Sequence, residues 1–149
     1  MSVMKTEIAF WDTSALIPLC CTKAGLTSRS TTLFRLFNKP VIWWGTSAEV
    51  YSALARLHQE SQISVRELNT SIKRWEQFQI IVREVNPTEM LKRLAKGIPV
   101  QYQLRSLDAF QLAAALAWCQ ERPRRRPFVC FDSKLAEAAD QAGFTVHTL

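Results

Sequence analysis

Five short apolar segments alternate with helical segments along this chain, and that alternation restricts its fold more than any other feature. The apolar segments, interpreted as strands, are residues 8–11, 41–44, 80–85, 128–131 and 145–149. Residue spacing and end signals predict helices from about residue 13 and over residues 26–37, 46–59, 64–75, 87–96, 106–118 and 133–141. Apolar strands interleaved with helices are typical of an α/β fold in which helices cover both faces of a mainly parallel sheet.

Length, charge and cysteine spacing set broad limits. A chain of 149 residues has the size of one ordinary domain, so we expect a single domain over residues 1–149. No apolar stretch reaches the roughly 18 residues of a membrane span, and the N-terminus lacks the apolar region of a signal peptide, so we expect a cytoplasmic protein without membrane contact. The four cysteines fit no zinc-binding pattern and are expected to be buried free thiols.

The formal net charge is +6, from 19 basic and 13 acidic residues. A basic surface raises the local concentration of polyanions such as nucleic acids. This argument gains weight if the acidic residues gather in one place, because the remaining surface is then more basic than the total suggests.

Four acidic residues stand at related positions of the strand–helix pattern. Asp12 directly follows the first strand and Asp132 the fourth, whereas Glu49 lies in the first turn of the helix after the second strand. The carboxyl ends of parallel strands lie at one edge of a sheet, so these three side chains can converge there. Asp108 lies in the first turn of its own helix, and it reaches the same edge only if that helix points its N-terminus there.

Helix capping is the simpler interpretation of each acid taken alone. An acid in the first helical turn is stabilised by the helix dipole, and Asp132 can cap the helix that follows it. Thr46 and Glu49 have the spacing of a capping box. Similar spacing recurs without evident chemistry at Ser64 with Glu67 and at Asn86 with Glu89.

Taken together, the acids favour a metal site. Clustered carboxylates raise one another's pKa, so a fold without a cation gains little by gathering four of them. Mg²⁺ and Mn²⁺ prefer oxygen ligands, commonly a few carboxylates with waters and substrate phosphates. Such a site neutralises phosphate charge, lowers the pKa of a bound water and stabilises a leaving oxygen.

Four segments resemble the motifs of the PIN-domain family, in the family's order and over almost the whole chain. They are residues 10–16 (FWDTSAL), 46–56 (TSAEVYSALAR), 104–113 (LRSLDAFQLA) and 128–135 (FVCFDSKL). The resemblance implies a three-layer PIN-like domain with a sheet of about five mainly parallel strands. It also implies a metal-dependent endoribonuclease and, as in small bacterial single-domain members, a VapC-type toxin that a small antitoxin inhibits.

Carried over residue by residue, the resemblance places the catalytic metal, Mg²⁺ or Mn²⁺, among Asp12, Glu49, Asp108 and Asp132. The last of these completes the set directly or through water. Ser14 is expected either to hold a carboxylate or a metal-bound water by a hydrogen bond, or to cap its helix. Cys130 departs from the family, since many members have Thr or Ser there, and a thiol is a poorer hydrogen-bond partner than a hydroxyl.

Basic and aromatic side chains near the motifs are candidates for RNA contact. The basic candidates are Arg105 and Lys134, beside acidic motifs, and the loop residues Arg124, Arg125 and Arg126. Each has the alternative role of a solvated or ion-paired surface residue. Trp43 and Trp44 face opposite sides of a strand, so core packing is the leading interpretation of both, with base stacking on Trp44 or its neighbours as the alternative.

Partners follow from the resemblance as well. RNA is the expected substrate, an antitoxin would cover the acidic site, and the helices over residues 26–37 and 64–75 would offer apolar grooves to it and to a homodimer contact. A non-catalytic RNA-binding or regulatory PIN-fold module is the alternative function. A phosphatase fits poorly, because Ser14 stands where its motif needs a second aspartate.

Overall fold

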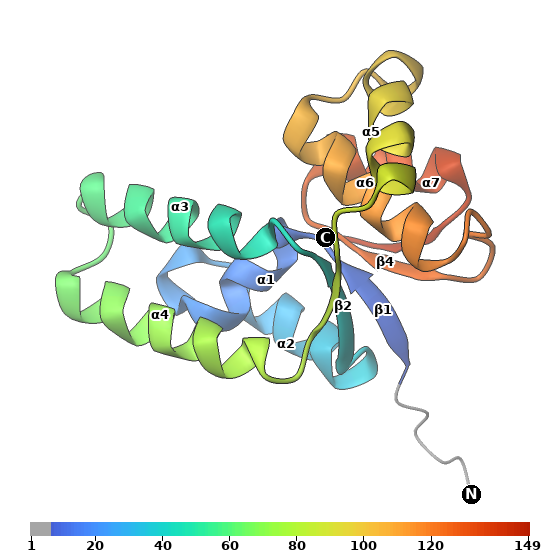
Figure 1. Cartoon of the computed structure of the whole chain (residues 1–149). Helices are drawn as coiled ribbons and strands as arrows, with labels where there is room; N and C mark the ends of the chain where they lie inside the picture. The colour runs from blue at the N-terminus through green and yellow to red at the C-terminus, as the bar shows by residue number, and fades with distance from the viewer. Residues whose placement is uncertain (1–6) are drawn as a thin grey trace, which may run out of the picture.

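The computed structural model describes residues 7–149 and contains a five-stranded sheet in which all neighbouring strands are parallel (Figure 1). In spatial order the strands are β3 (Arg83–Val85), β2 (Lys39–Trp43), β1 (Ile8–Trp11), β4 (Pro127–Val129) and β5 (Thr145–His147). The chain adds strands first on one side of β1 and then on the other, so the order switches between β1 and β4. Ligands of open α/β sheets bind outside the carboxyl ends of the strands at such a switch point.

Helices cover both faces of the sheet, which confirms the predicted three-layer α/β architecture. One layer holds α1 (Thr13–Cys20), the 3₁₀ helix η1 (Thr22–Ala24), α2 (Thr27–Leu36), α3 (Thr46–Gln59) and α4 (Val65–Gln79). The other holds α5 (Glu89–Tyr102), α6 (Ser106–Trp118) and α7 (Ser133–Ala142). Figure 1 shows the two groups on opposite sides of the strands, with α3 and α4 side by side.

Side chains alternate between the two faces along each strand, as the two-residue period of a β-strand requires. On β1, Phe10 packs in the cluster formed with α5–α7, whereas Ala9 and Trp11 pack in the cluster formed with α1–α4. Trp43 of β2 joins the first cluster and is buried, as predicted. The prediction that Trp44 packs in the core is wrong, because this residue lies beyond the end of β2 and its side chain is 55% exposed.

The third strand is shorter than the sequence predicts because the helix before it is longer. The strand predicted over residues 80–85 begins only at Arg83, since α4 continues past its predicted end near Trp75. The extra turn stacks Phe78 on Trp75, with ring centroids 5.7 Å apart. Ile80, which the apolar run assigned to the strand, lies in the connecting turn and is 84% exposed.

Of two predicted capping pairs outside the acidic motifs, the structure confirms one and contradicts the other. The Ser64 hydroxyl accepts a hydrogen bond from Glu67 N, and the Glu67 carboxylate accepts one from Ser64 N, both at 3.1 Å, so this capping box is confirmed. The pair predicted at Asn86 and Glu89 is wrong, because the N-cap of α5 is Thr88, whose hydroxyl accepts a backbone N–H at 3.1 Å. The predicted helix start at Pro87 is therefore wrong by two residues.

The end of α5 also differs from the prediction. Gly97 was expected to follow the helix, but α5 passes through Gly97 and Pro99 and ends at Tyr102. Glycine in a helix interior costs about 1 kcal/mol relative to alanine, and proline costs more. Burial offsets these costs, since Ala95 and Ile98 pack in the cluster formed with α6 and α7.

Two expectations drawn from composition concern the described residues 7–149. Within this range no helix is both long enough and apolar enough to span a bilayer. The four cysteines are buried and free, as predicted. Burial raises the pKa of the Cys20 thiol to about 12, so this thiol stays protonated near neutral pH.

Candidate active site

A cavity of about 670 Å³ opens at the carboxyl edge of the sheet, beside the switch point between β1 and β4. All four acids singled out in the sequence line it, although they belong to four separate parts of the chain. They are Asp12 after β1, Glu49 on α3, Asp108 on α6 and Asp132 before α7. The lining also includes Trp43, Trp44 and Arg56. The fold therefore brings together the side chains that sequence interpretation grouped.

Asp12 is the buried acid of the four, with 4% of its surface exposed. It caps α1, and its Oδ2 accepts hydrogen bonds from Ser14 N at 3.1 Å and from the Ser14 hydroxyl. The Cys130 thiol donates to the same oxygen at 3.5 Å. Burial raises the pKa of Asp12, these hydrogen bonds lower it, and the charge of Asp132 raises it again. Because the three donors all engage Oδ2, Oδ1 is the oxygen that Asp12 has left for a cation.

Ser14 ties together the two segments that flank the switch point. Its hydroxyl donates to Asp12 Oδ2 and accepts from Phe131 N at 2.9 Å, so it links the start of α1 to the chain after β4. Of the two roles expected for Ser14, the geometry favours the orienting of a carboxylate, since the N-cap of α1 is Asp12.

Cys130 also contacts two of the acids. Its thiol reaches Asp12 Oδ2 at 3.5 Å and the carbonyl oxygen of Asp132 at 3.3 Å. Burial, reinforced by the charge of Asp12, raises the pKa of this thiol, so it acts as a neutral donor. Cys130, which departs from the PIN-domain motif that the sequence resembles, thus contacts the acids directly. Its thiol makes weaker hydrogen bonds than a hydroxyl would.

Glu49 is not part of a capping box, contrary to the prediction for Thr46 and Glu49. The N-cap of α3 is Gly45, and both side chains meet Gln111 instead. Gln111 Nε2 donates to Thr46 Oγ1 at 3.0 Å and to Glu49 Oε2 at 2.9 Å. Burial raises the pKa of Glu49 to about 7, the hydrogen bond from Gln111 opposes this rise, and the neighbouring acids add to it. Glu49 therefore exchanges its proton near neutral pH.

Asp108 reaches the cavity because α6 points its N-terminus towards the carboxyl edge, the condition that the sequence left open. Burial raises the pKa of Asp108 to about 6, and the charges of Asp132 and Asp12 contribute to the rise. Lys134 and Arg105 act in the opposite direction, which places both cations within electrostatic range of Asp108. Neither Lys134 nor Arg105 is among the residues that line the acid-lined cavity, and Lys134 lines a separate one with Gln101 and Gln141.

Asp132 is exposed and caps α7, as predicted for it as a capping residue. Its Oδ1 accepts a hydrogen bond from Leu135 N at 2.8 Å. Asp12 and Asp132 are therefore both helix caps and both line the cavity. Each accepts these hydrogen bonds on one carboxylate oxygen, so capping and cation binding are compatible for both.

Gln111 is the buried residue that sequence interpretation missed. Besides Thr46 and Glu49, its amide nitrogen lies 3.0 Å from Thr13 Oγ1, so three acceptors share its two hydrogens. Its Oε1 has no hydrogen-bond partner within residues 7–149. Reversing the amide would set that oxygen against the Glu49 carboxylate, so Glu49 fixes the orientation. A signal existed, because residues three apart, such as Asp108 and Gln111, share a helix face.

The four acids suit a hydrated hard cation better than an enclosed metal. Across residues 7–149, no three or more His, Cys, Asp or Glu side chains form a group that could hold a metal ion. Mg²⁺ commonly needs only one or two carboxylates, because waters and substrate phosphates complete its octahedral shell. The oxygen-only donor set and the open cavity fit Mg²⁺ or Mn²⁺ and do not fit structural zinc.

The arginine-rich loop lies at the other edge of the sheet. Residues 124–126 directly precede β4, so they stand at its amino end, whereas the acids gather at the carboxyl ends. The Arg126 guanidinium lies 5.4 Å from the centre of the Trp118 ring. Contact of this loop with RNA stays a prediction, and any such contact would be made away from the acids.

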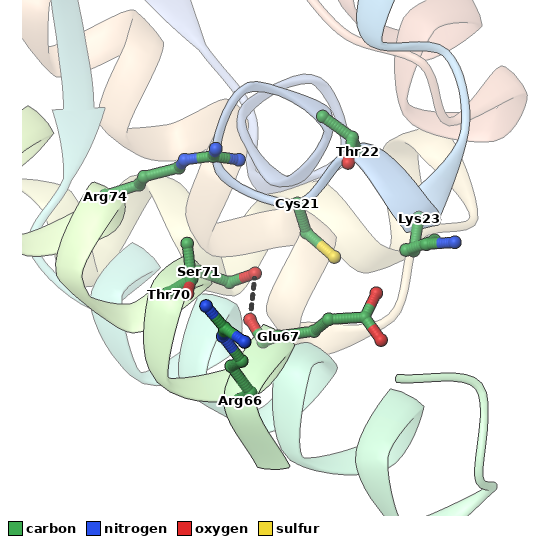
Figure 2. Close-up of a pocket in the computed structure, with 8 residues that line it drawn as sticks. All are labelled: Cys21, Thr22, Lys23, Arg66, Glu67, Thr70, Ser71 and Arg74. Atoms are coloured by element: carbon green, nitrogen blue, oxygen red, sulfur yellow. Dashed lines mark hydrogen bonds between the residues drawn. The ribbon is translucent and has the colours of Figure 1, made fainter. Parts of the chain in front are cut away.

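A smaller cavity of about 200 Å³ lies between η1 and α4 (Figure 2). Figure 2 shows Lys23, Arg66 and Arg74 around it. Its one acid, Glu67, is engaged in the capping box of α4. With three cationic side chains and a single committed carboxylate, this cavity lacks the ligands that a divalent cation requires. The larger cavity is therefore the candidate active site.

Comparison with known proteins gives relatives by structure only. No protein-family model matches the chain, and no curated protein matches its sequence. PAE2754 from Pyrobaculum aerophilum superposes with a TM-score of 0.64 at 15% identity, covering 97% of this chain and 92% of that one. One chain of a toxin–antitoxin complex from Klebsiella pneumoniae superposes with a TM-score of 0.59 at 20% identity, covering 85% and 88%. At such identities the similarity establishes a shared fold.

Proposed function

We propose that this protein is a divalent-metal-dependent endoribonuclease that uses Mg²⁺ or Mn²⁺. The observation that carries the proposal is the convergence of four acids, spread from residue 12 to residue 132, on one cavity at the carboxyl edge of the sheet. The raised pKa values of Asp12, Glu49 and Asp108 support it, because burying these carboxylates, and to a lesser extent placing them near one another, costs free energy that a bound cation would offset. RNA as the substrate is supported by the motifs that resemble PIN domains and by the net charge of +6.

The residues divide the work of such a site between holding the cation and attracting the substrate. Acids of this cavity would hold Mg²⁺ together with waters and a substrate phosphate, and the ion would supply neutralisation of phosphate charge and a lowered pKa of a water. Ser14 and Cys130 restrain the Asp12 carboxylate, and Gln111 restrains that of Glu49. Lys134 and Arg105, near Asp108, would attract the RNA backbone. In the cleavage step a water gives up a proton as its oxygen bonds to phosphorus, the bond from phosphorus to the 3′ oxygen breaks, and the 3′ oxygen takes up a proton.

The biological role that we propose is that of a toxin in a toxin–antitoxin pair. The fold shared with a chain of the Klebsiella pneumoniae toxin–antitoxin complex supports this role. An unregulated ribonuclease would damage its own cell, so we expect a small antitoxin to cover the cavity that holds the acids. A homodimer is the expected oligomeric state, by analogy with the family that the sequence resembles.

Cleavage of RNA by purified protein tests the enzymatic proposal. Wild type should cut labelled RNA with Mg²⁺ or Mn²⁺ and stop when EDTA is added, and Asp12→Asn should be inactive although folded. Asp140→Asn is the matched control, because Asp140 is an exposed acid of α7 outside the cavity. Binding of RNA without metal-dependent cleavage would instead identify a non-catalytic RNA-binding module.

Growth of expressing cells tests the toxin role separately. Expression of wild type should arrest growth, Asp12→Asn should not, and co-expression of the small open reading frame beside the gene should restore growth. Arrest that the neighbouring product does not relieve would remove the antitoxin from the proposal, while the nuclease activity measured in vitro would stand.

A further inference from the structure

The large apolar side chain of Trp44 is exposed to solvent at the edge of the acid-lined cavity. It directly follows β2, and its backbone N–H donates to Val85 O at 3.0 Å, which fixes the main chain there. Its side chain is 55% exposed and lines the same cavity as the four acids. A ligand that covers this indole would bury apolar area that water now contacts, which would favour binding at this position.

The indole of Trp44 rests on other aromatic rings. Trp43 meets it edge-on, with centroids 6.2 Å apart and an interplanar angle of 69°. Trp43 in turn stacks on Phe110 at 5.4 Å and 2°. Gly45 permits this arrangement, because a Cβ at that position would lie 2.5 Å from Trp43 Nε1. Two packed rings therefore hold the exposed ring in place from the side of the core. A ligand that covers Trp44 would restrict this side chain little further, so binding would cost little side-chain entropy.

We propose that Trp44 stacks on an unpaired base of the RNA substrate, next to the phosphate that is cut. The inference rests on the proposed ribonuclease function and adds a residue that positions the substrate, namely Trp44 acting on an unpaired base. Bases within a duplex are already stacked on their neighbours, so only an unpaired base can present its face to an indole. Aromatic stacking of this kind is the common way in which proteins hold single strands.

The surroundings of Trp44 favour a nucleotide over an apolar protein segment. The same cavity is lined by Asp12, Glu49 and Asp108, and an apolar segment that filled it would leave these carboxylates desolvated. A nucleotide places its base on the indole while its phosphate reaches the acids together with their cation. The cavity of about 670 Å³ falls within the range of ordinary small-ligand sites, roughly 300–1,000 Å³.

Arg56 extends the same path in the other direction. Arg56 lies on α3, two turns beyond Glu49, and it also lines the cavity. Trp44 lies just before the other end of the same helix. A strand of RNA that runs along α3 would pass from the indole, across the acids, to this guanidinium. The base of the RNA would then meet the indole, the phosphate to be cut would meet the acids, and the next phosphate would meet the guanidinium.

Binding measured without cleavage tests the proposal. In an Asp12→Asn background, randomised single-stranded RNA oligonucleotides and the same RNA annealed to its complement are titrated against Trp44, Trp44→Phe and Trp44→Leu. We expect Trp44→Leu to weaken single-strand binding at least fivefold, the factor that corresponds to about 1 kcal/mol of lost stacking, and Trp44→Phe to retain most of the affinity. Duplex binding should be weak and unaffected.

Tyr51→Leu is the matched control, since it also removes an exposed aromatic side chain of this region without touching the cavity. It should bind and cleave like wild type. With Asp12 restored, an oligonucleotide lacking the base beside the cut should lose as much cleavage as Trp44→Leu does, and combining the two changes should cause no further loss.

Three outcomes would overturn the inference or its foundation. Equal binding and cleavage by Trp44→Leu would remove the stacking role and leave the nuclease intact. Unchanged cleavage together with lost inhibition by a protein partner would assign the indole to that partner. Wild type that neither binds nor cuts RNA with any divalent metal would refute the proposed function itself.

Discussion

Asp108→Asn should make the metal-free protein more stable at neutral pH even though it disables the candidate active site. Asp108 is half-buried beside Asp132 and Asp12, and burial together with their charges raises its pKa to about 6. A raised pKa means that folding penalises the ionised carboxylate. An asparagine of the same shape carries no charge, so it avoids that penalty.

The size of the gain follows from the pKa. A value of about 6 against the ordinary 3.8 is a difference of about 2, which would correspond to about 3 kcal/mol for a fully buried group. Partial exposure allows solvent screening, which reduces this to roughly 1.5 kcal/mol. The substitution also removes a favourable charge from the first turn of α6, which costs about 0.5 kcal/mol. The net gain of about 1 kcal/mol should raise the melting temperature by about 2–4 °C.

The effect has a defined dependence on pH. Between the unfolded pKa near 3.8 and the folded pKa near 6, the folded state of wild type binds a proton that the unfolded state lacks. The penalty is therefore complete above about pH 7 and vanishes as the pH falls through 6 towards 4. Thermal melts in EDTA should show the advantage of Asp108→Asn at pH 7.5 and little advantage at pH 4. Added Mg²⁺ should narrow the difference at pH 7.5, because a cation relieves the same repulsion.

Glu67→Gln is a control of opposite sign within the same protein. Its hydrogen bonds with the backbone and hydroxyl of Ser64 lower the pKa of Glu67, so the ionised form stabilises the fold. Replacing it should lower the melting temperature at pH 7.5 and matter less as the pH falls through the depressed pKa. An Asp108→Asn protein that is less stable than wild type in EDTA, or whose gain does not change with pH, would refute the reasoning from carboxylate repulsion.

Three further predictions follow from contacts of the cavity and the core. Gln111→Leu removes the donor that lowers the pKa of Glu49, so the acidic limb of the pH–rate profile should move to higher pH; an unmoved limb would exclude Glu49 as the group that governs it. Gly45→Ala would set a Cβ 2.5 Å from Trp43 Nε1, so we expect a loss of roughly 1–3 kcal/mol and a changed near-ultraviolet circular dichroism spectrum, and an unchanged spectrum would contradict the clash. The four buried cysteines should resist alkylation in native protein and react in denaturant, as mass spectrometry can count.

The strand–helix order and the positions of Asp12 and Asp132 could be predicted because they depend on local pattern, whereas Asp108 joined the set through the resemblance to PIN domains. Apolar runs mark the strands, and Asp12 and Asp132 follow two of them directly. The errors arose where packing between distant segments outweighed local preference. Helix α5 continues through Gly97 because its apolar face is buried, and α4 continues because Phe78 finds an aromatic partner.

Side-chain direction was the least predictable level. Local spacing assigned Glu49 to a capping box, but its partner is Gln111, 62 residues away in the chain. Trp44 lies one position beyond the end of its strand, so the alternation that buries Trp43 does not apply to it. The exposure of one indole and the burial of one amide depend on how α3 and α6 dock, which no local pattern specifies.

The order in which the strands join the sheet has a consequence for the protein during its own synthesis. A nascent chain that has left the ribosome only as far as α6 already carries Asp12, Glu49 and Asp108, but it lacks both β4 and Asp132. The Ser14 hydroxyl then has no Phe131 amide to contact, and β1, which is central in the complete sheet, still lacks its β4 neighbour. If the proposed reaction requires Asp132, it cannot begin before β4 and the residues that follow it have been translated.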